Sequence, residues 1–210
     1  MQLFITGTTT GVGKTVFSCE LLRRWRRQGK KAIGLKPVST GDRRDAELLA
    51  EAMDGTLSVE EVNPAHWDIP AAPLVAYRRG GKPLDLDFLC EHVARFCRRY
   101  SHVVVEGIGG WLSPLAPGIT VREWVQRLSL PVILVTRSEL GTLSPTLATA
   151  ESILASGMCL RGIALNFHGV MPGPASTTHA EILEEWIGVP VFSFGGEAGF
   201  PQQFPDWLNS

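Results

Sequence analysis

The sequence predicts an α/β protein built on a doubly wound, mostly parallel sheet with helices on both faces. Two observations support this prediction. Short apolar runs alternate with amphipathic segments along the whole chain. Several of the apolar runs, such as 103–105 and 131–136, consist almost wholly of aliphatic residues, as do strands buried on both faces. Because no repeat or linker interrupts this alternation, we expect one domain over residues 1–210.

The chain opens with an apolar run at residues 2–6, which predicts a strand that ends just before a glycine. Residues 14–28 carry apolar side chains on one face and predict a helix that Gly29 ends. The segment 31–38, KAIGLKPV, predicts a second strand that closes at Pro37.

A short helix is expected at residues 45–53, where an Asp-Gly pair follows. Residues 56–83 contain four prolines and a Gly-Gly pair, and they predict mainly loop with a short strand at 74–77. The amphipathic segment 84–100 predicts a helix.

Residues 101–107, SHVVVEG, predict a buried strand with a carboxylate at its carboxyl end. Residues 120–128 predict a helix for which Thr120 is the expected N-cap. The later strands are expected at 131–136, 160–167 and 189–194, and the later helices at 144–156 and 176–187. Pro145 falls in the first turn of its helix, where proline is tolerated, and an aromatic, proline-containing tail follows the last strand.

The overall composition excludes several classes of protein. A net charge of −1 gives no electrostatic reason to expect nucleic acid or an anionic membrane as partner. The basic cluster at 23–31 is expected to be a solvated helix face. No apolar run is long enough for a membrane span, which favours a cytoplasmic protein. The four cysteines show no metal-ligand spacing, so we expect reduced, mostly buried thiols at Cys19, Cys90, Cys97 and Cys159.

The segment 7–15, GTTTGVGKT, lies between a predicted strand and a predicted helix, as a phosphate-binding P-loop does. Its spacing from Gly7 to Gly13 is one residue longer than in the usual form, which indicates a P-loop subclass. We expect Lys14 to reach the β- and γ-phosphates of a nucleotide and the Thr15 hydroxyl to bind Mg²⁺. The nucleotide-binding residues are then expected to be Gly11, Val12, Gly13, Lys14, Thr15 and Val16.

Two further strand ends carry charged side chains. Lys36 ends the second predicted strand, where it can face phosphate or an anionic intermediate. Asp42, Asp45 and Glu47 follow within reach, and spacing alone does not decide which of them serves the site.

Glu106 ends a run of three valines, a place where a carboxylate commonly coordinates Mg²⁺. The glycines after it, Gly107, Gly109 and Gly110, permit a tight loop whose N–H groups can meet a ligand.

Taken together, the three motifs GTTTGVGKT, KPVSTG and VEGIGG resemble the dethiobiotin synthetase family, which belongs to the P-loop NTPases. The resemblance extends over nearly the whole chain, including the segments 70–73, 130–136 and 140–149. It implies an ATP- and Mg²⁺-dependent cyclo-ligase of biotin synthesis that carboxylates 7,8-diaminononanoate with CO₂ and closes the ureido ring of dethiobiotin. It also implies a cytoplasmic homodimer with the 140–156 segment at its interface.

The resemblance assigns roles to individual residues. Thr15, Asp45 and Glu106 would hold Mg²⁺. Lys14 and Lys36 would stabilise the transferring phosphoryl group and the carbamate. The remaining contacts would be Thr10 and Thr40 with substrate or phosphate, the Gly107–Gly110 loop with the carbamate, and Asn166 with adenine.

The chain departs from the family pattern at the end of the site that would hold the substrate tail. Ser144-Pro145 replaces the usual Asn-His pair, and Leu74 stands where many members have His. Ser144 can still donate a hydrogen bond to a substrate carboxylate, and a helix N-terminus there still favours an anion. The alternatives are a paralogous ligase with another carboxylate substrate and a MinD/ParA-like ATPase switch. The switch is disfavoured because Thr9 replaces the second P-loop lysine of that class.

Overall fold

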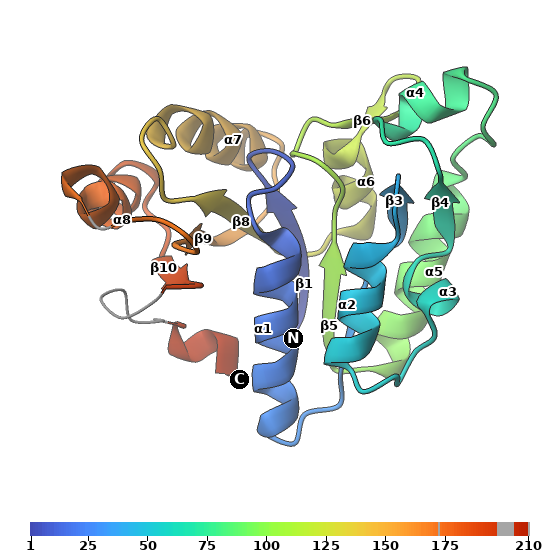
Figure 1. The fold of residues 1–210 in the computed structure, drawn as a ribbon, viewed down its shortest axis with the longest axis horizontal. Helices are drawn as coiled ribbons and strands as arrows, with labels where there is room; N and C mark the ends of the chain where they lie inside the picture. Colours follow the sequence, from blue (N-terminus) through green and yellow to red (C-terminus); the bar gives the residue numbers. More distant parts are fainter. Residues whose placement is uncertain (172, 197–203, 210) are drawn as a thin grey trace.

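The computed structural model describes residues 1–171, 173–196 and 204–209. Its centre is a six-stranded sheet in the order β10-β9-β8-β1-β5-β2, in which every pairing is parallel (Figure 1). The strands are β1 (Gln2–Gly7), β2 (Ala32–Leu35), β5 (His102–Glu106), β8 (Val132–Arg137), β9 (Leu160–Asn166) and β10 (Val191–Phe194). The predicted doubly wound sheet is therefore confirmed.

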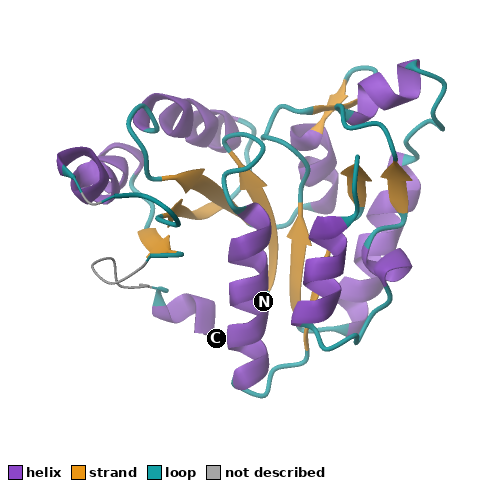
Figure 2. Ribbon diagram, in the orientation of Figure 1, coloured by secondary structure: helices purple, strands orange, loops and turns teal. Residues whose placement is uncertain are grey.

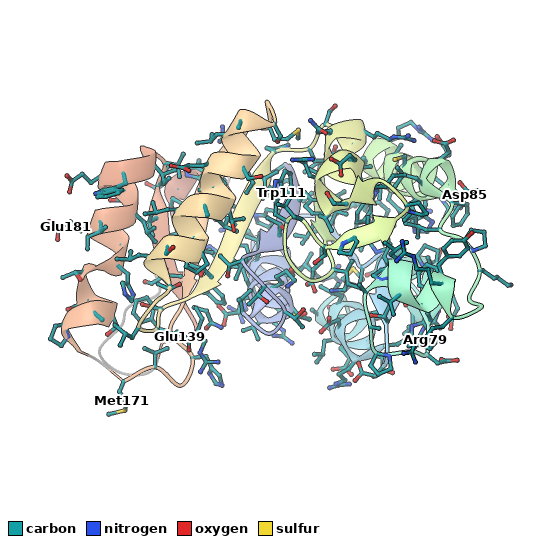
Figure 3. All side chains as sticks on the ribbon, turned by 90° about the horizontal axis from the view of Figure 1, so that it is seen from above. Arg79, Asp85, Trp111, Glu139, Met171 and Glu181 are labelled. Atoms are coloured by element: carbon teal, nitrogen blue, oxygen red, sulfur yellow. The ribbon has the colours of Figure 1, made fainter. Side chains whose placement is uncertain are left out.

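Helices cover both faces of the sheet (Figure 2). The helices of the main layers are α1 (Lys14–Arg27), α2 (Arg44–Ala52), α5 (Leu86–Arg99), α6 (Val121–Leu128), α7 (Leu143–Ala155) and α8 (Pro174–Ile187). From above, α1 and α2 lie on one side of the sheet, and α5, α6 and α7 lie on the other (Figure 3). A terminal 3₁₀ turn (Asp206–Asn209) packs beside α1, where the indole N–H of Trp25 donates to the carbonyl of Leu208.

The stretch 56–83 is more ordered than its prolines suggested. It contains α3 (Val59–Val62), β4 (Ala65–Trp67) and α4 (Pro73–Arg78). The prediction of a strand at 74–77 is wrong, because these residues belong to α4. Pro73 stands at the first turn of that helix, where its fixed φ suits the helical conformation and its missing N–H removes no hydrogen bond.

The second predicted strand also ends earlier than expected. β2 stops at Leu35, and the chain then forms a separate short strand, β3 (Val38–Thr40), which pairs with β4 outside the main sheet. A hairpin of β6 (Pro114–Ala116) and β7 (Ile119–Thr120) was likewise not predicted. These strands are too short to show a hydrophobic period in the sequence.

The cysteines are free thiols, but the expectation that most of them are buried is wrong. Only Cys19 is buried; Cys90 and Cys97 are half-buried and Cys159 is exposed. None of the described helices is long and apolar enough to cross a membrane.

The direction of the crossovers changes at β1. The chain runs from β1 to β2 on one side, whereas β8, the other neighbour of β1, leads to β9 and β10 on the opposite side. In open α/β sheets, ligands bind outside the carboxyl ends of the strands at such a switch point. The loop after β1 and the end of β5 meet at this edge, which is uppermost in Figure 1.

The N-cap of α6 supports a stability prediction. Thr120 accepts from the N–H of Arg122, and Glu123 reaches back to the N–H of Thr120, as expected from the sequence. We expect Thr120→Ala to lower the free energy of unfolding by about 1 kcal/mol in urea titrations, because the first turn of α6 loses its acceptor. Thr178→Ala, on the exposed face of α8, is the matched control and should change little. Equal values for the two variants would contradict this role for the cap.

Candidate active site

The P-loop folds as a strand, a tight turn and a helix. Gly11 and Gly13 have φ values of 79° and 100°, in the left-handed region that favours glycine. A Cβ at Gly13 would lie 2.2 Å from the Nδ2 of Asn166, so this position has no room for a side chain. No side chain of the described residues caps α1, and its first turn contains no acidic residue. The first N–H groups of the helix therefore remain available to an anion.

Lys14 begins α1 and is buried. Its ammonium donates to the carbonyl oxygens of Thr9 at 2.9 Å and Gly109 at 2.7 Å, and it thereby links the P-loop to the glycine-rich loop after β5. Burial, with the nearby charge of Lys36, lowers the pKa of Lys14 to about 8. Because two neutral carbonyls are its partners, a phosphate oxygen would be a stronger one.

The Thr15 hydroxyl lies 2.8 Å from Asp45 Oδ1 and 2.8 Å from Glu106 Oε1. One hydroxyl proton can serve only one of these two carboxylates at a time. The other oxygen of Glu106, Oε2, is buried and has no hydrogen-bond partner in the described residues. Three oxygen-bearing side chains thus converge, and a single hydroxyl proton lies between the two carboxylates.

These donors suit Mg²⁺, which prefers oxygen ligands and usually binds through one or two carboxylates together with phosphates and water. No group of three His, Cys, Asp or Glu side chains gathers within the described ranges. A metal here would therefore share its ligands between protein and nucleotide, as the chemistry of Thr15, Asp45 and Glu106 allows.

Lys36 is the second cation of the site and is 3% exposed. Its ammonium lies 2.7 Å from Glu106 Oε1, 3.1 Å from Asp45 Oδ2 and 2.9 Å from the carbonyl of Gly107. Burial opposes the charge on Lys36, but the two carboxylates outweigh it, and the pKa of Lys36 is raised above its ordinary value. Lys36 therefore stays positively charged at neutral pH.

The three acidic residues that the sequence left open make different contacts. Asp45 faces Thr15 and Lys36. Burial tends to raise its pKa, but Lys36 and the Thr15 hydroxyl hold that pKa below its ordinary value. Asp42 instead accepts from the N–H of Arg44, and Glu47 pairs with the same arginine on the surface.

The loop at Gly107–Gly110 uses part of its hydrogen-bonding capacity internally. The N–H of Gly107 donates to the carbonyl of Ile5, and the N–H of Gly110 donates to Ser113 Oγ at 2.8 Å. Gly109 has a φ of 62°, and a Cβ there would lie 2.2 Å from the same serine oxygen. The loop is therefore fixed in place, and two of the N–H groups that were expected to meet a ligand, those of Gly107 and Gly110, donate within the protein.

A cavity of about 670 Å³ joins most of the predicted residues. The predicted residues that line it are Thr10, Gly11, Gly13, Lys14, Thr15, Val16, Lys36, Thr40, Asp42, Asp45 and Gly109. The lining also includes Ser39, Leu48, Ile108, Ser113 and residues 70–73, which the sequence did not single out. The segment 70–73 was noted only for its resemblance to the family, and nothing in its spacing placed it here.

A second cavity of about 440 Å³ lies between the P-loop and α7. Thr10 lines both cavities, and Gly110 and Trp111 line the second one. Trp111 lies near the middle of the carboxyl edge of the sheet (Figure 3). Ser144 lines neither cavity; it is exposed in the first turn of α7.

Val12 and Asn166 are both buried, and neither lines the first cavity. Asn166 donates from Nδ2 to the carbonyl of Val12 at 3.0 Å and accepts at Oδ1 from the N–H of His168 at 2.9 Å. Its amide thus connects the P-loop to the end of β9. With the Val12 and His168 contacts in place, the second Nδ2 hydrogen and the second lone pair of Oδ1 remain for a base.

Known proteins resemble this chain in sequence and in fold. The model of a family described as an AAA domain matches residues 1–193. Among solved structures, the fold is similar to FtsY from Thermotoga maritima, with a TM-score of 0.59 and 19% identity over 100% of this chain and 68% of that one. FtsY from Elizabethkingia anophelis gives a TM-score of 0.58 at 14% identity, covering 99% of this chain and 62% of FtsY. These likenesses concern the fold alone.

Curated relatives are closer. A protein of Anaeromyxobacter sp. (strain K) is 40% identical over 177 residues, which cover 82% of this chain and 79% of the relative. One from Akkermansia muciniphila is 34% identical over 205 residues, covering 98% and 95%. One from Serratia marcescens is 37% identical over 178 residues, covering 81% and 78%. All three carry the name ATP-dependent dethiobiotin synthetase BioD. With identities of this size over most of its length, the chain belongs to the dethiobiotin synthetase family.

Proposed function

We propose that the protein is an ATP- and Mg²⁺-dependent cyclo-ligase that makes dethiobiotin from 7,8-diaminononanoate and CO₂, acting as one P-loop domain over residues 1–210. The names of its relatives support the reaction. The observation that carries the proposal is the convergence of two buried lysines with the oxygens of Thr15, Asp45 and Glu106 beside one cavity.

The reaction needs positioning and charge neutralisation more than covalent catalysis. One amine of the diamine adds to CO₂ and loses a proton, which forms a carbamate. A carbamate oxygen takes the γ-phosphoryl group of ATP, which releases ADP. The second amine then attacks the carbamate carbon, loses a proton and expels phosphate, which closes the ureido ring. Both the transferred phosphoryl group and the carbamate are anionic, so cations held beside them lower the barrier.

The two lysines would supply this charge from different sides. Lys14 would exchange its carbonyl partners for the β- and γ-phosphates. Lys36, which two carboxylates hold at the end of the cavity, would face the carbamate and the transferring phosphoryl group. Thr10 and Thr40 line the same cavity and would donate hydroxyl hydrogen bonds to substrate or phosphate.

Thr15, Asp45 and Glu106 would hold Mg²⁺, which when bound neutralises charge on the nucleotide phosphates. The unpartnered Oε2 of Glu106 supports this assignment, since a buried carboxylate oxygen without a donor is costly unless a cation shares it. Asn166 would contact adenine through the remaining hydrogen of its amide.

The substrate tail would extend toward α7, where the second cavity lies between Thr8–Thr10 and the helix. We also propose that α7 lies at the interface of a cytoplasmic homodimer. The exposed side chains of Leu140 and Leu154, 90% and 43% exposed, support an interface on this side. Sedimentation of a single-chain mass at micromolar concentration would contradict the dimer.

One observation favours a second candidate, a paralogous ligase with another carboxylate substrate. Ser144 and Pro145 are exposed in the first turn of α7, on the side where the substrate tail would end. Serine offers a single hydroxyl there in place of the usual asparagine amide, so the carboxylate would be held differently. The site would then accept an acid of different length.

Fixation of labelled bicarbonate tests both candidates. The protein is incubated with ATP and Mg²⁺, with and without 7,8-diaminononanoate, and acid-stable label is counted. We expect label only with the diamine. ATP hydrolysis without fixed carbon would contradict the proposed substrate and favour the paralogue.

Lys14→Ala should lower ATP turnover by at least about 10²-fold, because it removes the ammonium proposed to hold the β- and γ-phosphates, and Lys36 remains paired with its two carboxylates. Lys31→Ala, an exposed lysine before β2, is the matched control and should turn over ATP as the wild type does. Near-normal turnover by Lys14→Ala would remove the P-loop assignment.

Glu106→Gln keeps the volume of the side chain and removes its charge. We expect the Mg²⁺ concentration for half-maximal turnover to rise at least about tenfold, with a smaller change in ATP binding. Glu181→Gln on the surface of α8 serves as control (Figure 3). If Mg²⁺ titrations of Glu106→Gln and wild type coincide, Glu106 does not serve the metal.

A further inference from the structure

Asn63 is a fully buried polar residue that lies between α3 and β4, outside the cavity and its lining. Its Nδ2 donates to the carbonyl of Lys36 at 2.7 Å and to that of Ala65 at 3.3 Å. Its Oδ1 accepts from Ser39 Oγ at 2.8 Å and from the Nε of Arg43 at 3.2 Å. Both ends of the amide are thus used, and the partners fix which end is which, because carbonyls face the nitrogen and donors face the oxygen.

The first of these contacts holds the backbone of Lys36. The main sheet ends at Leu35 on β2, and Pro37 has no N–H with which to continue a ladder. The N–H of Lys36 instead donates to the carbonyl of Val62, while its carbonyl accepts from Asn63. The backbone of the lysine is therefore held by the 62–63 segment and not by the six-stranded sheet.

The second contact fixes the strand after the lysine. Ser39 is buried, pairs with His66 in the β3–β4 register and places its hydroxyl 2.9 Å from His66 Nδ1 as well as against Asn63. Ser39 and Thr40 both line the cavity. By bonding to Ser39 and to the carbonyl of Lys36, Asn63 also fixes the position of these two residues relative to Lys36.

The third contact reaches the helix that carries Asp45. Arg43 is the N-cap residue of α2, and its guanidinium donates to Oδ1 of Asn63 and, at 3.0 Å, to the carbonyl of Asn63. Asp45 follows in the first turn of that helix and lies 3.1 Å from the Lys36 ammonium. One amide side chain therefore connects the backbone of Lys36 to the start of the helix that bears its carboxylate partner.

We propose that Asn63 is a positioning residue for the ligase reaction, one that sets the distance between Lys36 and Asp45 without touching substrate. The inference deepens the proposed function and rests on it for the role of Lys36. Its physical basis is that the planar amide of Asn63 supplies a donor to Lys36 and an acceptor to Arg43 from one group. A shift of about 1 Å in a charged catalytic group can cost about 10²-fold in rate.

The kinetic test compares Asn63→Ala with wild type in diamine-dependent carbon fixation. We expect kcat to fall about 10²-fold. The KM for ATP should change by less than about threefold, because the hydrogen bonds that Asn63 makes within the described residues go to Lys36, Ser39, Arg43, Val59 and Ala65 and not to the P-loop. Leu57→Ala, which removes a buried side chain from the turn before α3, is the control for lost stability. Its thermal midpoint should fall while kcat stays near the wild-type value.

Asn63→Asp separates hydrogen bonding from packing. It preserves volume and the acceptor toward Arg43, but sets a carboxylate oxygen against the carbonyl of Lys36, so kcat should fall as in the alanine variant. Wild-type kcat in Asn63→Asp, or an equal loss of kcat in Leu57→Ala, would overturn the proposal.

A readout that needs no catalysis is the reactivity of the Lys36 amine. In the wild type this amine is nearly enclosed, so acetylation by a water-soluble ester, followed by peptide mass spectrometry, should be slow. We expect faster labelling in Asn63→Ala than in Leu57→Ala, and equal labelling would overturn the proposal. If Asn63→Ala does not fold, Asn63→Asp and Ser39→Ala take its place. If the wild type fixes no carbon, the proposed function fails, and the labelling alone decides whether Asn63 positions Lys36.

Discussion

The buried ion pair between Lys36 and Glu106 is the interaction on which the rest of the site depends. The two charges lie 2.7 Å apart, at 3% and 0% exposure of their side chains. Removing one partner of such a pair typically costs about 3–5 kcal/mol, because the other charge is then buried alone. Ion pairs of this kind are maintained only where further hydrogen bonds complete them, and here Thr15, Asp45 and the carbonyl of Gly107 do so. The pair therefore holds together β5, α1, α2 and the chain after β2.

The same charges determine how the site would respond electrostatically to a bound nucleotide. Lys14 and Lys36 carry two positive charges, and Asp45 and Glu106 carry two negative ones, so the cluster is balanced as it stands. A nucleoside triphosphate would add several negative charges to this balanced cluster. A further cation then becomes electrostatically favourable, and the spare oxygen of Glu106 is a ready ligand for it.

Local signals in the sequence sufficed for the P-loop and for Glu106. The P-loop is a strand, turn and helix in one stretch, and Glu106 follows directly on its strand, so both could be placed without tertiary information. Thr120 was identified as an N-cap for the same reason. The sequence could not separate Asp45 from Asp42 and Glu47, since all three are within reach along the chain, and only the packing of α2 shows that Asp45 contacts Thr15 and Lys36. Asn166 was assigned to adenine, whereas the structure shows that its amide also joins the P-loop to β9.

The segment between α2 and α5 was the least predictable, and the reason is physical. Its strand β4 is three residues long and gains its stability from β3 and from the amide of Asn63, which are contacts that no period in the sequence reveals. One local signal was available: Ser58 and Glu61 form a capping box that starts α3.

Phosphate binding needs mainly backbone N–H groups and a helix end, which a short motif specifies completely. The placement of Lys36 needs a distant segment to hold the chain where it leaves the sheet. The part of the site proposed to bind phosphate can therefore be recognised from sequence, whereas the contacts that hold the backbone of Lys36 become visible only in three dimensions.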